Sequence, residues 1–157
     1  MMEQKSDILF VFDMVRELEE SGRFSELRAY TAHSDVSVYA HSIAVASISL
    51  RLARLSGLRV DIRSLVRGAL LHDYYLYDWH IPSPNRHLHG IYHPMVAASN
   101  AFRDYHINPR EFNIICAHMF PLPPTRLPLC TEAWLVVIAD KIAASAEVLW
   151  CLPMNII

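Results

Sequence analysis

The stretch from Ser37 to Ser56 constrains the fold most, because its apolar side chains recur every three or four residues. The apolar stripe comprises Val38, Val45, Ile48, Leu52 and Leu55. This period is that of an α-helix with one buried face, and Gly57 provides a C-terminal stop. The chain has no Asn-Gly or Asp-Gly turn between alternating runs, which a sheet protein would need. The sequence therefore predicts an all-α fold.

The same reasoning predicts five further helices. Their expected ranges are 7 to 21, 61 to 77, 92 to 106, 110 to 119 and 131 to 149. Asp7, Asp61 and Thr131 are suitable N-caps, and Pro94 is expected in a first helical turn, where a missing N–H costs nothing. Two longer, proline-containing loops, at 80 to 91 and 120 to 130, complete a compact bundle of about six helices.

Composition limits the classes of function. With 157 residues, 53% of them hydrophobic, we expect a single domain spanning residues 1–157. The chain has 14 basic and 16 acidic residues and a net charge of −2, so nucleic acid is not expected as a partner. The apolar runs at 8 to 12 and 133 to 139 are too short for a signal peptide or a membrane span. The cysteines are Cys116, Cys130 and Cys151, and their lack of C-x-x-C spacing favours a reducing cytoplasm.

Three of the predicted helices place ionisable residues on their apolar faces. His41 fills a gap in the stripe of the 37 to 56 helix, His72 completes the next stripe with Asp73 as its immediate neighbour, and Asp140 faces inward from the last helix. A lone buried histidine is usually a neutral core residue, but a buried carboxylate needs a cation. Lys141 or an arginine from another helix could supply that charge. A metal ion would satisfy all four groups at once.

His93 and His118 lie at helix ends that open into the two long loops. Each shares a face with apolar residues of its own helix. Each could simply cap a helix or hydrogen-bond a loop carbonyl. Together with the four inward groups, they could instead complete a second metal position.

This order of residues resembles the HD-domain superfamily of metal-dependent phosphohydrolases. The matching elements are His41, Leu71-His72-Asp73, His93-Pro94, His118 and Ala139-Asp140-Lys141, within residues 33 to 150. The resemblance implies a helical bundle in which His41, His72, Asp73 and Asp140 coordinate one metal ion. Members with two ions add histidines between the His-Asp pair and the final aspartate, and His93 and His118 are similar to those additions.

The chain departs from the better-known subgroups. Signalling-dinucleotide phosphodiesterases carry a lysine after the His-Asp pair, a Gly-Tyr-Pro signature and a paired His-His, whereas residues 74 to 77 here are Tyr-Tyr-Leu-Tyr and His118 stands alone. Asp78 and His80 replace the acidic pairs of nucleotidase and (p)ppGpp-hydrolase relatives. Residues 74 to 80 are similar to a bacterial subgroup known simply as HD-domain proteins, so analogy does not give the substrate.

The resemblance implies hydrolysis of a phosphoester, of a nucleotide or a small phosphorylated metabolite, by metal-activated water. One or two divalent ions (Mn, Fe, Co, Ni, Zn or Mg) would be bound, with Asp73 bridging them and orienting the water as the catalytic residue. Candidate phosphate-binding residues are Lys141, His89, His33 and Arg126, each of which could equally be a solvated charge or a loop cap. Two alternatives are a di-iron oxygenase of the same fold and a non-catalytic nucleotide or metal sensor.

Aromatic and apolar residues suggest further contacts. Tyr74, Tyr75, Tyr77, Trp79 and Tyr92 flank the expected metal positions. They could stack on a base or sugar, or form a packed wall. The apolar tail at 152 to 157 is expected to bury against something, and a homo-oligomer is one way to do so.

Overall fold

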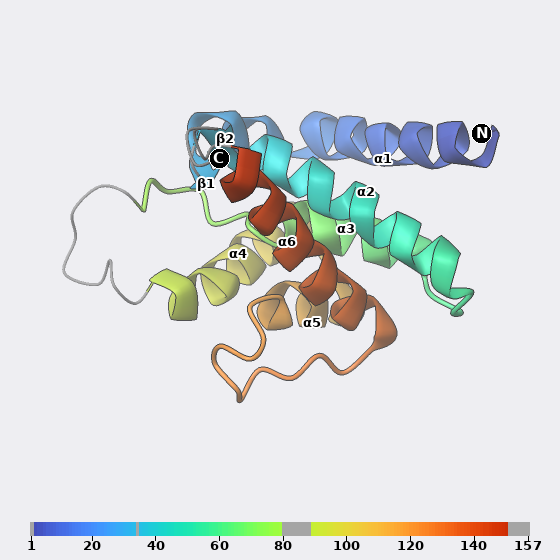
Figure 1. Ribbon diagram of the computed structural model, residues 1–157. Coiled ribbons are helices and arrows are strands. Elements are labelled where there is room, and N and C mark those ends of the chain that lie inside the picture. The colour runs from blue at the N-terminus through green and yellow to red at the C-terminus, as the bar shows by residue number, and fades with distance from the viewer. Residues whose placement is uncertain (1, 34, 80–88, 151–157) are drawn as a thin grey trace, which may run out of the picture.

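The computed structural model describes residues 2–33, 35–79 and 89–150, and shows a helical bundle (Figure 1). Its elements in chain order are α1 (Met2–Ser21), the 3-10 helix η1 (Phe24–Ala29), β1 (Thr31–His33), β2 (Val36–Ser37), α2 (Val38–Ser56), α3 (Ile62–Leu71), α4 (His89–Tyr105), α5 (Pro109–Ala117) and α6 (Thr131–Trp150). The predicted all-α fold is confirmed. The short antiparallel pair β1 and β2 was not predicted.

Helix α2 is central to the bundle. It packs most extensively against α3 and α6, while α1 lies along its outer side. Helix α5 contacts α3, α4 and α6 (Figure 1). The buried core therefore draws on all six of the described α-helices and on η1, and the predicted metal ligands lie on or at the ends of α2 to α6.

Side-chain caps set several of the helix starts. Ser37 accepts from the backbone N–H of Ala40, and Asp61 accepts from that of Ser64. Asn108 and Glu111 form a capping box around the first turn of α5. Gly57 adopts a left-handed conformation with φ 64°, which ends α2 as predicted.

The first and last helices begin differently from the prediction. Helix α1 starts at Met2, so Asp7 is inside the helix, and its carboxylate accepts from Arg54 of α2 instead of capping. Helix α6 starts at Thr131 itself, so Thr131 is a helical residue.

The third predicted helix was extended too far. Helix α3 ends at Leu71, with His72 as its C-cap, and not at residue 77. The N–H of Tyr74 donates to Leu71 O and the N–H of Tyr75 donates to Asp73 O, so turn bonds replace the helical pattern. Leu76 has φ 55°, a left-handed value that no helix contains. The aromatic residues after Asp73 therefore lie on an irregular segment.

Two other boundaries also moved. Helix α4 begins at His89, so Pro94 is its sixth residue and lies beyond the first turn. A proline there leaves one helical carbonyl without its N–H partner. Helix α5 ends at Ala117, with His118 as its C-cap, so Met119 is outside the helix.

Gly68 lets α3 approach α5 closely. A Cβ atom at this position would lie 2.8 Å from Cδ1 of Ile114, well inside van der Waals contact. The contact brings together the C-terminal ends of the two helices, where the rings of His72 and His118 have centroids 4.8 Å apart.

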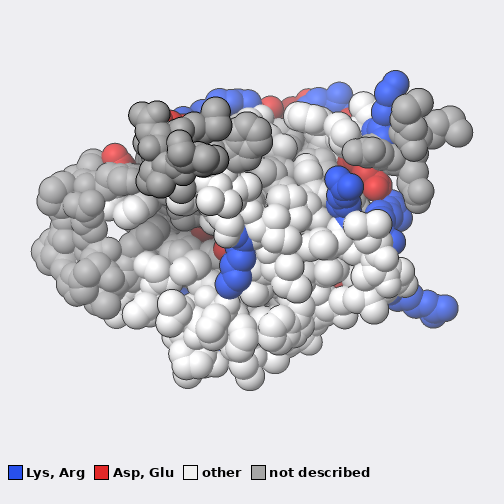
Figure 2. Space-filling view, viewed as in Figure 1, with Lys and Arg blue, Asp and Glu red and all other residues white. Residues whose placement is uncertain are grey.

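The face of the molecule over α6 is largely uncharged (Figure 2). Trp134, Ile138 and Ile142 are exposed side chains along α6, and the described residues on this face form no row of lysines or arginines. Among the described residues, no helix is both long and apolar enough to cross a membrane.

Candidate metal centre

Six buried side chains meet between the helices. They are His41 from α2, His72 and Asp73 from the end of α3, His93 from α4, His118 from the end of α5, and Asp140 from α6. None is more than 9% exposed. The fold thus brings together the whole set of metal ligands predicted from the sequence, from five helices.

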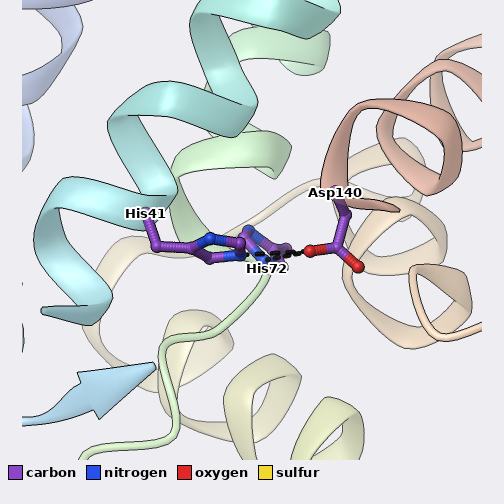
Figure 3. A group of neighbouring side chains, drawn as sticks. All are labelled: His41, His72 and Asp140. Carbon is purple, nitrogen blue, oxygen red and sulfur yellow. Dashed lines mark hydrogen bonds and ion pairs between the residues drawn. The ribbon is translucent and has the colours of Figure 1, made fainter. Parts of the chain in front are cut away.

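His41, His72 and Asp140 form one group (Figure 3). Nε2 of His41 lies 3.1 Å from Oδ1 of Asp140, and Nε2 of His72 lies 3.7 Å from the same oxygen. One potential ligand atom from each residue lies within 4.8 Å of the others. The three side chains come from three helices and point toward one another, so they could hold a metal ion.

Asp73 lies between this group and a second one. Its Oδ2 is 3.5 Å from Nε2 of His72, while its Oδ1 is 3.1 Å from Nε2 of His93 and 3.4 Å from Nε2 of His118. His93 and His118 face each other, with their Nε2 atoms 2.8 Å apart. His72, Asp73 and His118 could also hold an ion. The two oxygens of one carboxylate therefore face two histidine groups.

The imidazole rings are oriented by their other nitrogens. Nδ1 of His72 donates to Ala69 O at 2.7 Å, and Nδ1 of His118 donates to Ile115 O at 2.8 Å. Because a carbonyl only accepts, the proton of each neutral ring resides on Nδ1. Nε2 then presents its lone pair to the centre, as metal coordination requires.

Unsatisfied atoms show that a cation fits this place. Within the described residues, Nε2 of His72 and Oδ1 of Asp73 are buried without a hydrogen bond of good geometry. A buried acceptor left in this way costs about 1–3 kcal/mol. A cation would satisfy both atoms, and the mixture of imidazole and carboxylate is a common metal-binding donor set.

The site places a neutral His72 next to ionised carboxylates. Burial lowers the pKa of His72 to about 4, so its ring is uncharged at neutral pH. Burial opposes ionisation of Asp140, but the hydrogen bond from His41 outweighs it and lowers the pKa of Asp140 to about 2. Burial likewise opposes ionisation of Asp73, yet His72, His118 and His93 hold the pKa of Asp73 well below its usual range. Two buried carboxylates thus carry negative charge where a cation would bind.

Glu147 is a site residue that the sequence analysis missed. Its Oε1 and Oε2 lie 2.9 Å and 3.1 Å from Nδ1 of His41, and its side chain is 12% exposed. Burial disfavours a charged His41, but the bonds to Asp140 and Glu147 raise the pKa of His41 to about 10. Glu147 follows Asp140 by seven residues, or two helical turns, on α6. That spacing was the available signal.

The structure does not bring the predicted phosphate-binding residues together as it does the six candidate metal ligands. Lys141 is exposed and makes no ion pair with Asp140 among the described residues; His41 contacts that carboxylate instead. Arg126 donates to Ile91 O at 2.8 Å and so joins the loop after α5 to α4. His33 is the last residue of β1 and His89 the first of α4, and their side chains lie outside the described part of the structure. The role of these four residues stays a prediction.

A cavity of about 160 Å³ opens beside the histidine cluster. Its lining comprises Ala32, Asp73, Tyr75, Trp79, Gly90, His93, His118, Met119 and Asp140. Of the flanking aromatic residues, Tyr75 and Trp79 line the cavity, whereas Tyr74 is a core residue whose hydroxyl donates to Asp104. Four of the six cluster side chains therefore border a space that a small molecule could enter.

A helical bundle with buried His and Asp residues beside a cavity defines a candidate metalloprotein. The HD domain profile matches residues 38–145, more than half of the chain, and this range includes all six side chains of the cluster. The chain belongs to the HD domain family, whose members are generally metal-dependent phosphohydrolases. Neither the comparison with curated proteins nor that with solved structures gives a match.

Proposed function

We propose that the protein hydrolyses a phosphoester of a nucleotide or a small phosphorylated metabolite, using one or two divalent metal ions. The observation that carries this proposal is Asp73, whose two oxygens face different histidine groups next to a cavity. A bound divalent ion would lower the pKa of its water toward roughly 7 and would offset phosphoryl charge.

The residues divide into three roles. His41, His72 and Asp140 would hold the first ion, and His93 and His118 the second. Asp73 would be shared between them. As an ionised carboxylate it can also accept a hydrogen bond from the attacking water and orient it.

The donor set limits the choice of metal. Imidazole and carboxylate together suit Mn, Fe, Co, Ni, Zn or Mg, and four histidines favour the transition metals. Their fixed rings reduce the reorganisation that binding would require.

The cavity limits what can lie next to the metal ligands. A volume of about 160 Å³ corresponds to roughly five water molecules, enough for a phosphoryl group and a few further atoms. Tyr75 and Trp79 would contact the part of the substrate beyond the phosphoryl group. Lys141, Arg126, His33 and His89 are the candidates for contacts with its charge.

The test compares the metal content and activity of the wild type and Asp73→Ala. Protein purified without chelator is analysed for metals and assayed on phosphomonoesters, nucleotides and cyclic dinucleotides. Asp73→Ala should lose metal and reduce hydrolysis by about 10³-fold or more, because it removes the shared ligand. Asp13→Ala, which removes an exposed carboxylate from α1, is the matched control and should behave like the wild type.

Each of the other possible results points to a different ligand assignment or a different function. A full metal complement in Asp73→Ala would contradict the ligand assignment. A metal-loaded wild type that is inert on the phosphate panel but consumes O₂ when reduced with iron would be a di-iron oxygenase. Binding of a nucleotide or metal without turnover would indicate a sensor.

A further inference from the structure

We propose that Glu147 is a positioning residue that holds the ring of His41 in the form that can coordinate metal. The inference rests on the proposed metal centre. Glu147 lies outside the part of the chain that matches the family profile, residues 38–145. Its carboxylate nevertheless accepts from Nδ1 of the fully buried His41 at 2.9 Å.

A single helix contacts both nitrogens of this imidazole. Oδ1 of Asp140 on α6 lies 3.1 Å from Nε2, and Glu147, two turns further along α6, accepts from Nδ1 at 2.9 Å. With Glu147 removed, the proton of a neutral ring would be drawn to Nε2 and donated to Asp140. That tautomer has no lone pair on the atom that faces the cluster. Glu147 therefore selects the tautomer with a free Nε2.

His41 needs a side-chain partner because of its position in its helix. His72 and His118 are the C-caps of α3 and α5, where last-turn carbonyls lack a helical partner and can accept from Nδ1. His41 is the fourth residue of α2, with the body of the helix still to follow. The carbonyls around it bond within α2, so the acceptor has to come from another helix. Glu147 provides it.

The contact should also strengthen the ligand. A carboxylate that accepts from the second nitrogen of a metal-binding histidine raises the basicity of the coordinating nitrogen. Removing such a partner typically weakens metal affinity by about 10- to 100-fold. A residue that served only the stability of α6 would not change affinity in this way.

The experiment titrates Co²⁺ into the metal-stripped 157-residue chain and into its Glu147→Ala and Glu147→Gln variants, following the visible absorption of the ion. Glu147→Ala should weaken binding by about 10- to 100-fold, and Glu147→Gln less, because an amide oxygen still accepts from Nδ1.

Glu19→Ala is the matched control. Glu19 also bonds a side chain of α2, the hydroxyl of Tyr39, and its loss changes the net charge equally. It should bind Co²⁺ like the wild type.

The outcomes separate this inference from the proposed function. A wild type that binds no metal would contradict the proposed metal centre itself. A wild type that binds Co²⁺, with unchanged affinity in Glu147→Ala, would overturn the role of Glu147 alone. If Glu147→Ala does not fold, Glu147→Asp, which withdraws the carboxylate by one methylene, replaces it. Unchanged affinity in that variant would also overturn the proposal.

Discussion

The imidazole of His72 is fully buried, and its surroundings limit what it can do. A carbonyl fixes its Nδ1 proton, burial keeps it neutral, and its Nε2 faces two carboxylates. His118 repeats the carbonyl contact at the end of α5. At the scale of the residue, the site is therefore a set of oriented nitrogen and oxygen donors.

His118→Ala tests whether the centre binds two ions. We expect two metal ions per wild-type chain and one in the variant, because the second ion would lose one of its two histidines. Elemental analysis gives the ratio, and circular dichroism checks that the variant stays folded. One ion in both proteins would mean that His118 has a structural role.

Asp104 links three parts of the chain through its carboxylate. It accepts from Arg103 at 2.7 Å, from Arg23 at 2.9 Å and from the hydroxyl of Tyr74 at 3.0 Å. The hydrogen bond from Arg103, supported by those from Arg23 and Tyr74 and opposed by burial, lowers the pKa of Asp104 to about 2. An unfolded aspartate titrates near 3.9, so the folded pKa is the lower one.

The pH dependence of stability follows from this difference. The contribution of Asp104 is complete above about pH 4 and is lost as the pH falls toward the folded pKa. Asp104→Asn should therefore lower the free energy of unfolding by about 1 kcal/mol near neutral pH. Urea unfolding should show the gap between wild type and variant narrowing by about pH 3. A gap that is constant with pH would exclude this linkage.

At the scale of the element, the C-terminal ends of α3 and α5 both face the cluster. The carbonyl end of a helix carries partial negative charge, which favours a nearby cation. Because α3 ends at Leu71, it supplies both this terminus and the turn that carries Asp73. A helix continued to residue 77 would have supplied neither.

Gly68→Ala tests the close packing of α3 on α5. The added methyl group would meet Ile114 at 2.8 Å, so we expect the free energy of unfolding to fall by about 1–3 kcal/mol. Gly90→Ala is the control, since its added methyl group would meet only Met119, at 3.6 Å. Chemical denaturation of both variants makes the comparison. Equal stability of Gly68→Ala and the wild type would show that the helices can separate at little cost.

At the scale of the whole molecule, the cluster connects elements that are far apart in the chain. His41 and Asp140 are separated by 99 residues and bond directly. An ion held by ligands from several helices would bind the folded chain and not the unfolded one. Binding and folding should therefore be coupled.

Metal removal should lower the thermal stability of the protein. At a free ion concentration of roughly 1,000 times the Kd, binding adds about 4 kcal/mol, or on the order of 10 °C in Tm for a domain of this size. Calorimetry with and without chelator measures the shift. Asp73→Ala should show a much smaller shift, whereas a wild type indifferent to chelator would contradict metal binding.

The sequence alone predicted the helical class and the six candidate ligands that the fold brings together. Apolar periodicity placed His41, His72 and Asp140 on buried faces, because a buried stripe needs only local spacing to be recognised. The same pattern could not find the end of α3, since Leu76 continues the apolar spacing while its backbone leaves the helix. Helix boundaries depend on turn bonds that periodicity does not report.

Only the tertiary structure decided which groups partner one another. The sequence did not reveal the contact of Glu147, because that contact exists only where α6 packs against α2. This packing brings the Glu147 carboxylate within 2.9 Å of Nδ1 of His41. The contacts of Asp104 and Arg126 likewise join residues distant in the chain. The physical reason is that spacing along one helix shows which face is buried, while partners depend on how separate helices pack.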